Sequence, residues 1–331
     1  MGQNGMIKNF KTLRESSLLP AIVGLPGLVV CALSITGFFG LHGWMTELTS
    51  HFRLQYAGSL ALAAIAVGFF RKFRAAALFA AFSVLNLAVI APLYFGGPAS
   101  ARADAPRLKI LQMNVRTENE DYTAVRNLVL VENPDVLALD EVDDKWLAEL
   151  ASVTKLYPFQ LTHPRNDNFG IALFSRVPWT EPQVLNLGHA IVESLSVKLS
   201  LEGRVVTVLC THPLPPGSPA TAQMRNDQLA GIAQWVRAQR TPVMVIGDLN
   251  TTPWSPYFQK LLTDSGLQNS AQGYGLQTSW PANYPLLAIP IDHCLLSPDL
   301  VAVARRIGPD LGSDHYPLIV VVAIASHSTA N

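Results

Sequence analysis

The sequence is poor in cysteine and in charged residues, and it lacks several common catalytic motifs. Its 3 cysteines lie in apolar runs, where buried free thiols are the default; Cys210 and Cys294 would pair only if their strands were neighbours outside the cytoplasm. Neither C-x-x-C nor H-E-x-x-H occurs, which excludes the usual zinc motifs. The standard glycine-rich phosphate loops and the G-x-S-x-G elbow are also absent, which argues against the common nucleotide-binding and serine-hydrolase sites.

Apolar residues make up 49 % of the chain and are concentrated before residue 100. The stretch from Leu18 to Gly40 carries no charge and is long enough to cross the roughly 30 Å hydrocarbon layer of a bilayer. Two further apolar runs are separated by RKFR and predict a helical hairpin. We therefore predict an N-terminal membrane domain of residues 1–95 with about three transmembrane helices, over residues 18–40, 54–70 and 75–95.

Basic residues set the predicted orientation of these helices. They lie before the first run and in the hairpin turn: Lys8, Lys11 and Arg14, then Arg71, Lys72 and Arg74. Because Lys and Arg favour the cytoplasmic ends of spans, the chain after residue 95 is predicted to lie outside the cytoplasm, as part of a multi-pass protein of a bacterial inner membrane. In an alternative, the first run is an uncleaved signal anchor and the other two form a buried hairpin, which also exports the C-terminal part.

Residues 96–106, GGPASARADAP, separate the membrane domain from a globular domain of residues 107–325. Small residues and proline without periodicity are typical of a linker. The ASARADA portion also resembles a signal-peptidase site, although a flexible tether is the simpler interpretation. From residue 105 onward the chain holds 21 Asp and Glu against 16 Lys and Arg, a net charge of −5, which argues against tight nonspecific binding of nucleic acid.

Short apolar strands alternate with amphipathic helices after residue 107. Strands are predicted over residues 107–115 and 134–142, and Glu202 with Gly203 is predicted to turn a hairpin. Mixed strands, hairpins and interspersed helices predict an α/β fold in which two mixed β-sheets pack face to face with helices outside. A simple doubly wound sheet is not expected.

Acids, amides and imidazoles recur where these strands end. They are Asn114, Glu141, His212, Asp248, Asn250, Asp292, Asp314 and His315. His293 lies among them, but the alternation of side chains along a strand turns it away from Asp292 and predicts a core or surface histidine. Because strand ends gather at one edge of a sheet, side chains far apart in the sequence can meet in one cleft. Hard oxygen donors such as Glu141 suit Mg²⁺ or Mn²⁺. An Asp or Asn can hold an attacking water, and a histidine fixed by a carboxylate can stabilise charge that develops on a phosphate.

The motifs that carry these residues are QMNV, LDEV, GIALFSR, THP, GDLN, IDHCLL and GSDHYPL. In this order and at this spacing they resemble the endonuclease/exonuclease/phosphatase superfamily, which includes deoxyribonuclease I. The resemblance covers residues 107–323. It implies a four-layer α/β sandwich that cleaves phosphate esters with Mg²⁺, or with Mn²⁺.

By position, the resemblance implies five catalytic residues. Asp248 would orient or deprotonate the attacking water, and Asn250 would hold the water and the phosphate in place. His212 would contact the phosphate. His315 would be the catalytic imidazole, fixed by Asp292.

The resemblance also implies a metal site. Glu141 would be the principal ligand with Asn114 beside it, and Asp314 would complete the metal or water shell. Arg116 occupies a position where some nuclease members carry an acidic ligand, so a site for one metal ion centred on Glu141 is expected.

The predicted function is that of a membrane-anchored, metal-dependent phosphoesterase. Its predicted partners are the lipid bilayer and a phosphoester substrate, which is a nucleic acid, a phospholipid headgroup or a small molecule; no protein partner is predicted. The alternative is a membrane-anchored binding module with the same fold and no catalysis. The intact set of acids and imidazoles disfavours that alternative, because a site that had lost its catalytic activity would have no reason to retain these residues.

Overall fold

The computed structural model describes residues 18–96, 101 and 104–325 of the chain. It divides into two compact units, Met1–Pro92 and Leu93–Asn331, which we call the N-terminal and the C-terminal unit. The basic group formed by Lys8, Lys11 and Arg14 lies outside the described residues, and so does most of the predicted linker.

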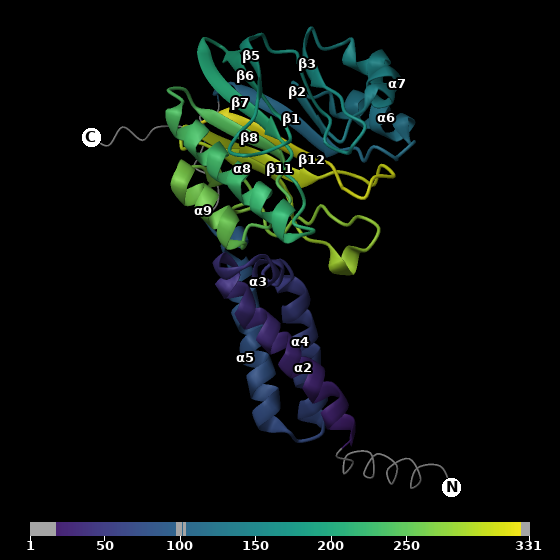
Figure 1. Cartoon of the computed structure of the whole chain (residues 1–331), viewed down its shortest axis with the longest axis vertical. Helices are drawn as coiled ribbons and strands as arrows, with labels where there is room; N and C mark the ends of the chain where they lie inside the picture. Colours follow the sequence, from purple (N-terminus) through teal and green to yellow (C-terminus); the bar gives the residue numbers. More distant parts are fainter. Residues whose placement is uncertain (1–17, 97–100, 102–103, 326–331) are drawn as a thin grey trace, which may run out of the picture. The chain divides into compact units, whose positions relative to one another are not determined.

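Helices form the N-terminal unit (Figure 1). In chain order they are α2 (Leu18–Thr36), η1 (Gly37–His42), α3 (Trp44–Leu48), α4 (Arg53–Phe69) and α5 (Phe73–Ile90), followed by η2 (Ala91–Tyr94). The helices α2, α4 and α5 share one apolar core that includes Cys31, Leu60 and Phe79.

Two helical stretches among the described residues are long and apolar enough to span a membrane, Ala21–His42 and Phe73–Tyr94. The prediction of about three transmembrane helices is therefore wrong in number. The 17 residues of α4 extend about 25 Å at 1.5 Å per residue, less than the hydrocarbon thickness. Moreover, α4 begins at the buried Arg53, whose Nη1 donates to Ser34 O at 2.7 Å and to Asn86 Oδ1 at 3.2 Å.

Two six-stranded mixed β-sheets form the C-terminal unit. The first has the strand order β11 (Leu300–Ile307), β12 (Leu318–Ile324), β1 (Arg107–Asn114), β2 (Val136–Asp140), β4 (Ile171–Ser175), β3 (Phe159–His163). The second has the order β5 (Trp179–Leu185), β6 (Ser194–Leu201), β7 (Arg204–Thr211), β8 (Val243–Asp248), β10 (Asp292–Leu296), β9 (Gln268–Asn269). The pairs β1–β2 and β7–β8 are parallel.

The sheets pack face to face and helices cover their outer faces. Ile110 of β1 and Ile246 of β8 belong to the same buried cluster between the sheets. On the first sheet, α6 (Tyr122–Glu132) and α7 (Asp144–Thr154) pack through residues such as Trp146. On the second, α8 (Pro219–Ala238) and α9 (Pro256–Ser265) pack through residues such as Phe258 (Figure 1). The predicted arrangement of two packed mixed sheets flanked by helices is confirmed.

Cys210 and Cys294 are both buried free thiols. Each pairs in register with Ile246, from opposite sides of β8. One strand therefore separates them, which corresponds to about 9–10 Å between their backbones, too far for a disulfide.

A glycine in β8 fixes the close approach of β7 and β8. Gly247 has φ 143°, and a Cβ atom there would lie 2.0 Å from the backbone oxygen of Thr211. No larger residue fits without separating the two strands just before Asp248.

We predict that Gly247→Ala lowers the free energy of unfolding by about 3 kcal/mol, because the new methyl group clashes with backbone and the φ angle disfavours an L side chain. Denaturant unfolding followed by tryptophan fluorescence measures this. Gly217→Ala is the matched control, since a Cβ there meets no atom within 4 Å in the part of the chain that the structure describes. Equal stability of the two variants would contradict the packing described for Gly247.

Candidate active site

The strand registers bring the predicted site residues to one edge of the sandwich. In the parallel pair β1–β2, Asn114 lies opposite Asp140, so Glu141 follows beside Asn114. In the antiparallel pair β8–β10, Asp248 lies opposite Asp292. Gln112 joins the two sheets there, because its Nε2 donates to Asp140 Oδ2 at 2.9 Å and to Asp292 Oδ1 at 2.8 Å.

Two site residues that lie just after the end of a strand have left-handed backbone conformations. Glu141 has φ 63° and Asn250 has φ 49°, which non-glycine residues adopt at a cost of order 1 kcal/mol. Such a conformation persists only where the surrounding structure enforces it, and it is frequent at active sites.

A buried cluster of acids and imidazoles forms the centre of the site. Nδ1 of His315 lies 2.9 Å from Asp292 Oδ2, and its Nε2 lies 3.6 Å from Asp248 Oδ2. Nε2 of His212 also lies 3.6 Å from Asp248 Oδ2. Asp248 is thus placed between two imidazoles, one of which is held by a second carboxylate.

The two histidines differ in charge at neutral pH. Burial by itself lowers the pKa of His315, but the carboxylates of Asp292 and Asp248 outweigh it and raise that pKa to about 10. Burial and the His315 charge lower the pKa of His212 to about 3. His315 is therefore an imidazolium, while His212 is a neutral ring.

The two aspartates differ as well. Burial raises the pKa of Asp248 well above its usual range, which the His315 charge offsets only in part. Burial also acts on Asp292, but the charge and the hydrogen bond of His315 leave the pKa of Asp292 below its usual value. Asp292 is the stable counterion of His315, and Asp248 is the carboxylate suited to accept a proton.

Asn250 is held from several directions. Its backbone N–H donates to Asp248 Oδ1 at 2.8 Å, its Nδ2 donates to Pro213 O at 2.9 Å, and the same Nδ2 lies 3.3 Å from Nε2 of His212. The buried Arg225 of α8 donates from Nη1 to the Asn250 backbone oxygen at 2.7 Å. The amide of Asn250 is thereby fixed beside both Asp248 and His212.

The predicted metal ligands lie next to this cluster. Nδ2 of Asn114 donates to Glu141 Oε1 at 2.8 Å and approaches Asp248 Oδ2 at 3.4 Å. Oδ1 of Asn114 accepts the backbone N–H of Arg116 at 3.0 Å, which fixes the orientation of the amide. The shortest of these contacts is with the Glu141 carboxylate, which Asn114 therefore orients.

Glu141 and Asp314 form a pair of half-buried carboxylates. Burial raises the pKa of Glu141 and the charge of Asp314 adds to this rise, although the hydrogen bond from Asn114 and the charge of His315 oppose it. Oδ2 of Asp314 accepts from Trp280 Nε1 at 3.0 Å, which leaves Oδ1 for another partner. Two hard oxygen donors that repel each other fit a divalent cation such as Mg²⁺. A different set, Asp248, Asp292 and His315, has ligand atoms that all lie within 4.8 Å of one another.

Residues 111–315 match the model of the Endonuclease/Exonuclease/phosphatase family, a range that includes all eight predicted site residues. The chain belongs to this family. Membership suggests a hydrolase that acts on phosphoester bonds, and the family typically depends on a divalent metal ion. No curated protein is similar enough in sequence to match the chain.

Solved structures with the same fold include the human Nocturnin catalytic domain with a bound sulfate anion, at 17 % identity and TM-score 0.56, covering 71 % of this chain and 99 % of that one. Truncated TDP2 of Caenorhabditis elegans has 18 % identity and TM-score 0.56, with coverages of 66 % and 98 %. A family member from Beutenbergia cavernae has 19 % identity and TM-score 0.53, with coverages of 68 % and 73 %. At these identities the similarity concerns the fold.

Sequence reasoning missed several residues that position the site. Gln112 alternates with Asn114 along β1 and so lies on the same face, a signal that was present in the QMNV motif. Asp140 is buried, with a pKa raised to about 7 by burial, and its Oδ2 accepts the backbone N–H of Asp248 at 3.2 Å. No sequence signal marks Arg225, because its partner lies 25 residues further along the chain.

His293 follows Asp292 but is a core residue. It is buried, its Nε2 lies 2.8 Å from Thr251 O, and its ring packs on that of Phe258 with centroids 4.6 Å apart. The alternation of side chains along β10 places it on the face opposite to that of Asp292.

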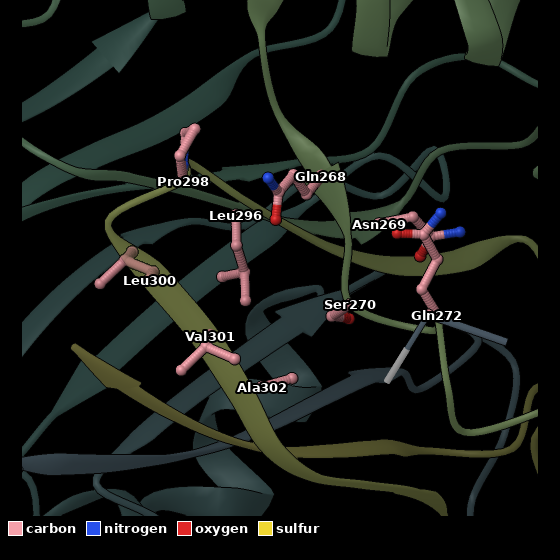
Figure 2. Close-up of a pocket in the computed structure, with 10 residues that line it drawn as sticks. Gln268, Asn269, Ser270, Gln272, Leu296, Pro298, Leu300, Val301 and Ala302 are labelled. Atoms are coloured by element: carbon pink, nitrogen blue, oxygen red, sulfur yellow. The ribbon is translucent and has the colours of Figure 1, made fainter. Parts of the chain in front are cut away.

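A small hollow of about 140 Å³ elsewhere in the C-terminal unit is a different feature. The amides of Gln268, Asn269 and Gln272 line it together with apolar residues of β10 and β11 (Figure 2). It contains none of the predicted site residues.

We predict that acid destabilises the fold through His293. Burial lowers the pKa of His293 to about 4, against about 6.5 in an unfolded chain. Between these values the unfolded chain binds a proton that the folded chain does not. The free energy of unfolding should therefore fall, by about 3 kcal/mol in all, as the pH decreases from about 6.5 to about 4.

The variant His293→Gln isolates this contribution, because glutamine can still donate to Thr251 O but does not titrate. Denaturant unfolding at several pH values should give a shallower acid dependence for the variant. Identical dependences would show that His293 does not titrate as described.

Proposed function

We propose that the C-terminal unit is a Mg²⁺-dependent phosphoesterase that hydrolyses phosphodiester or phosphomonoester bonds. The observation that carries the proposal is the buried chain of contacts from Asp292 through His315 to Asp248. It supplies a fixed positive charge and a proton-accepting carboxylate at one point, which is what hydrolysis of a phosphate ester requires.

Each of the five residues has a distinct role in this proposal. Asp248, with its raised pKa, accepts the proton of the attacking water, and Asn250 orients that water and the phosphate. The imidazolium of His315 stabilises the negative charge that builds up on the phosphate oxygens in the transition state. His212 is neutral and contacts a phosphate oxygen without adding a second charge. Asp292 keeps His315 protonated and oriented.

Glu141 and Asp314 would hold the metal ion, with Asn114 orienting Glu141. When bound, Mg²⁺ supplies positive charge to the phosphate oxygens. We place it at Glu141 because Glu141 and Asp314 are only half-buried and so can be reached by an ion, whereas Asp248 and Asp292 are buried around His315. Mn²⁺ has the same preference for oxygen ligands and would substitute for Mg²⁺.

We further propose that the helices Ala21–His42 and Phe73–Tyr94 anchor the chain in a membrane. Only 22 % and 28 % of their most apolar windows are buried within the described chain, whereas the core helix of a soluble protein is mostly buried. Arg71, Lys72 and Arg74 precede or begin α5 and favour the cytoplasmic side for that end. The C-terminal unit, which follows α5, would then lie outside the cytoplasm.

Nucleic acid and lipid phosphoesters are both candidate substrates, because the proposed site chemistry suits either. A structural neighbour with 16 % identity, TDP2 of D. rerio, was solved with a single strand DNA product, which supports the nuclease reading. The net charge of −5 beyond residue 105 gives little electrostatic attraction for a polyanion.

We predict that the full chain in detergent hydrolyses bis-p-nitrophenyl phosphate with Mg²⁺ or Mn²⁺ and that EDTA abolishes the activity. Asp248→Asn and His315→Asn should each lower kcat about 10²–10⁴-fold, because each removes proton transfer or charge stabilisation at the phosphate. Release of p-nitrophenolate measures the rate.

Asp264→Asn is the control for this series, since Asp264 forms a surface ion pair with Lys260 and should keep full activity. A folded, metal-loaded chain that cleaves no phosphoester would favour the binding module without catalysis. Full activity of Asp248→Asn would overturn the assignment of the proton acceptor.

Metal binding can be tested without turnover. Glu141→Gln should weaken Mn²⁺ binding about 10-fold or more, because it removes the charged ligand, and electron paramagnetic resonance of free Mn²⁺ measures the affinity. Asp292→Asn should bind Mn²⁺ with little change. The reverse order of effects would place the ion at Asp248, Asp292 and His315 instead.

A further inference from the structure

A short apolar loop precedes β10. Residues 281–288 form a loop that is closed at its base by two backbone hydrogen bonds between Trp280 and Ile289, of 3.1 and 2.6 Å. The turn is ordered by further bonds, from Tyr284 N to Pro281 O and from Leu287 N to Tyr284 O, and it contains the short helix η3 (Pro285–Leu287). We call residues 284–287 the apolar tip.

The apolar tip exposes large side chains. Leu286 is 90 % exposed, Tyr284 66 % and Leu287 52 %. No charged residue occurs anywhere between Thr278 and Asp292. Single exposed apolar residues are ordinary, but contiguous apolar patches mark surfaces that contact a protein, a ligand or a membrane.

The base of the same loop forms hydrogen bonds with Asp314 of the proposed active site. Trp280 Nε1 donates to Asp314 Oδ2 at 3.0 Å, and Ala282 N donates to Asp314 O at 2.7 Å. The Trp280 ring also lies beside His315, with centroids 6.4 Å apart. Whatever contacts the apolar tip is therefore held next to the residues proposed to bind phosphate.

We propose that the apolar tip enters the boundary between headgroups and acyl chains of a lipid bilayer, and that the substrate is a phosphoester carried by a membrane amphiphile. The substrate part rests on the proposed phosphoesterase function. A bilayer is the apolar phase available to this chain, because its own apolar helices leave most of their surface exposed. Tyrosine beside leucine without charge is the composition that suits a membrane interface.

Insertion can be measured independently of catalysis. The cysteines of the chain are all buried, so Leu286→Cys can be labelled selectively with an environment-sensitive fluorophore. In phosphatidylcholine proteoliposomes of the full chain, doxyl-labelled lipid should quench the label at 286. Val131→Cys on α6, at a site that is 78 % exposed, is the matched control and should stay unquenched.

Equal quenching at the two sites would overturn the insertion. A second result would also overturn it. If the label at 286 is equally shielded from water in detergent and in bilayers, and doxyl lipid does not quench it, then a protein partner or a second copy of the chain covers the tip.

The substrate class is tested with two esters that share one scissile bond. Hydrolysis of p-nitrophenyl hexadecyl phosphate in bilayers and of p-nitrophenyl ethyl phosphate in solution both transfer water to phosphorus and release p-nitrophenolate. The double variant Leu286→Ser, Leu287→Ser should lower kcat/KM for the hexadecyl ester about tenfold, since membrane affinity scales with buried apolar area. The ethyl ester should be cleaved at an unchanged rate, and Val131→Ser should alter neither.

The outcomes separate the two proposals. Quenching at 286 with an unchanged ratio of hexadecyl to ethyl ester hydrolysis would overturn the amphiphilic substrate. Quenching without hydrolysis of either ester would sustain the insertion and overturn the proposed phosphoesterase function.

Discussion

The ion pair between Asp292 and His315 is the interaction on which the site depends. Both side chains are buried, and a buried charge is tolerated only when it is paired and hydrogen-bonded. Asp292 meets this condition through His315 on one oxygen and through Gln112 on the other. Gln112 belongs to the first sheet and Asp292 to the second, so the charge at the centre of the site exists only when the sheets are packed together.

The same ion pair gives neighbouring groups different chemical properties. His315 takes the positive charge, and its charge keeps the nearby His212 neutral. Asp292 serves as counterion, while the more weakly compensated Asp248 is left to accept protons. Residues of similar type thereby acquire distinct roles from their positions relative to one charge. The outlying carboxylates Glu141 and Asp314 are less buried than these two aspartates, which is the physical reason to propose them as the ligands of a cation.

The N-terminal unit shows the same rule for buried charge in an apolar setting. Arg53 is buried at the start of α4, where its guanidinium reaches Ser34 of α2 and Asn86 of α5. A polar residue within apolar helices has to find partners on neighbouring helices. Here those contacts join the three helices into one small bundle.

The sequence by itself determined the local features of this protein. The alternation and order of its motifs predicted two packed mixed sheets flanked by helices, and the position of polar residues at strand ends predicted which eight side chains would gather. These properties are local because they follow from residue type and spacing along single strands. The tertiary structure decided the number of apolar helices that can span a membrane, the buried links from Gln112, Asp140 and Arg225, the orientation of Asn114 and the exposure of the apolar tip. Each of these depends on partners up to 180 residues away or on which surface is left uncovered, and neither quantity exists until the chain has folded.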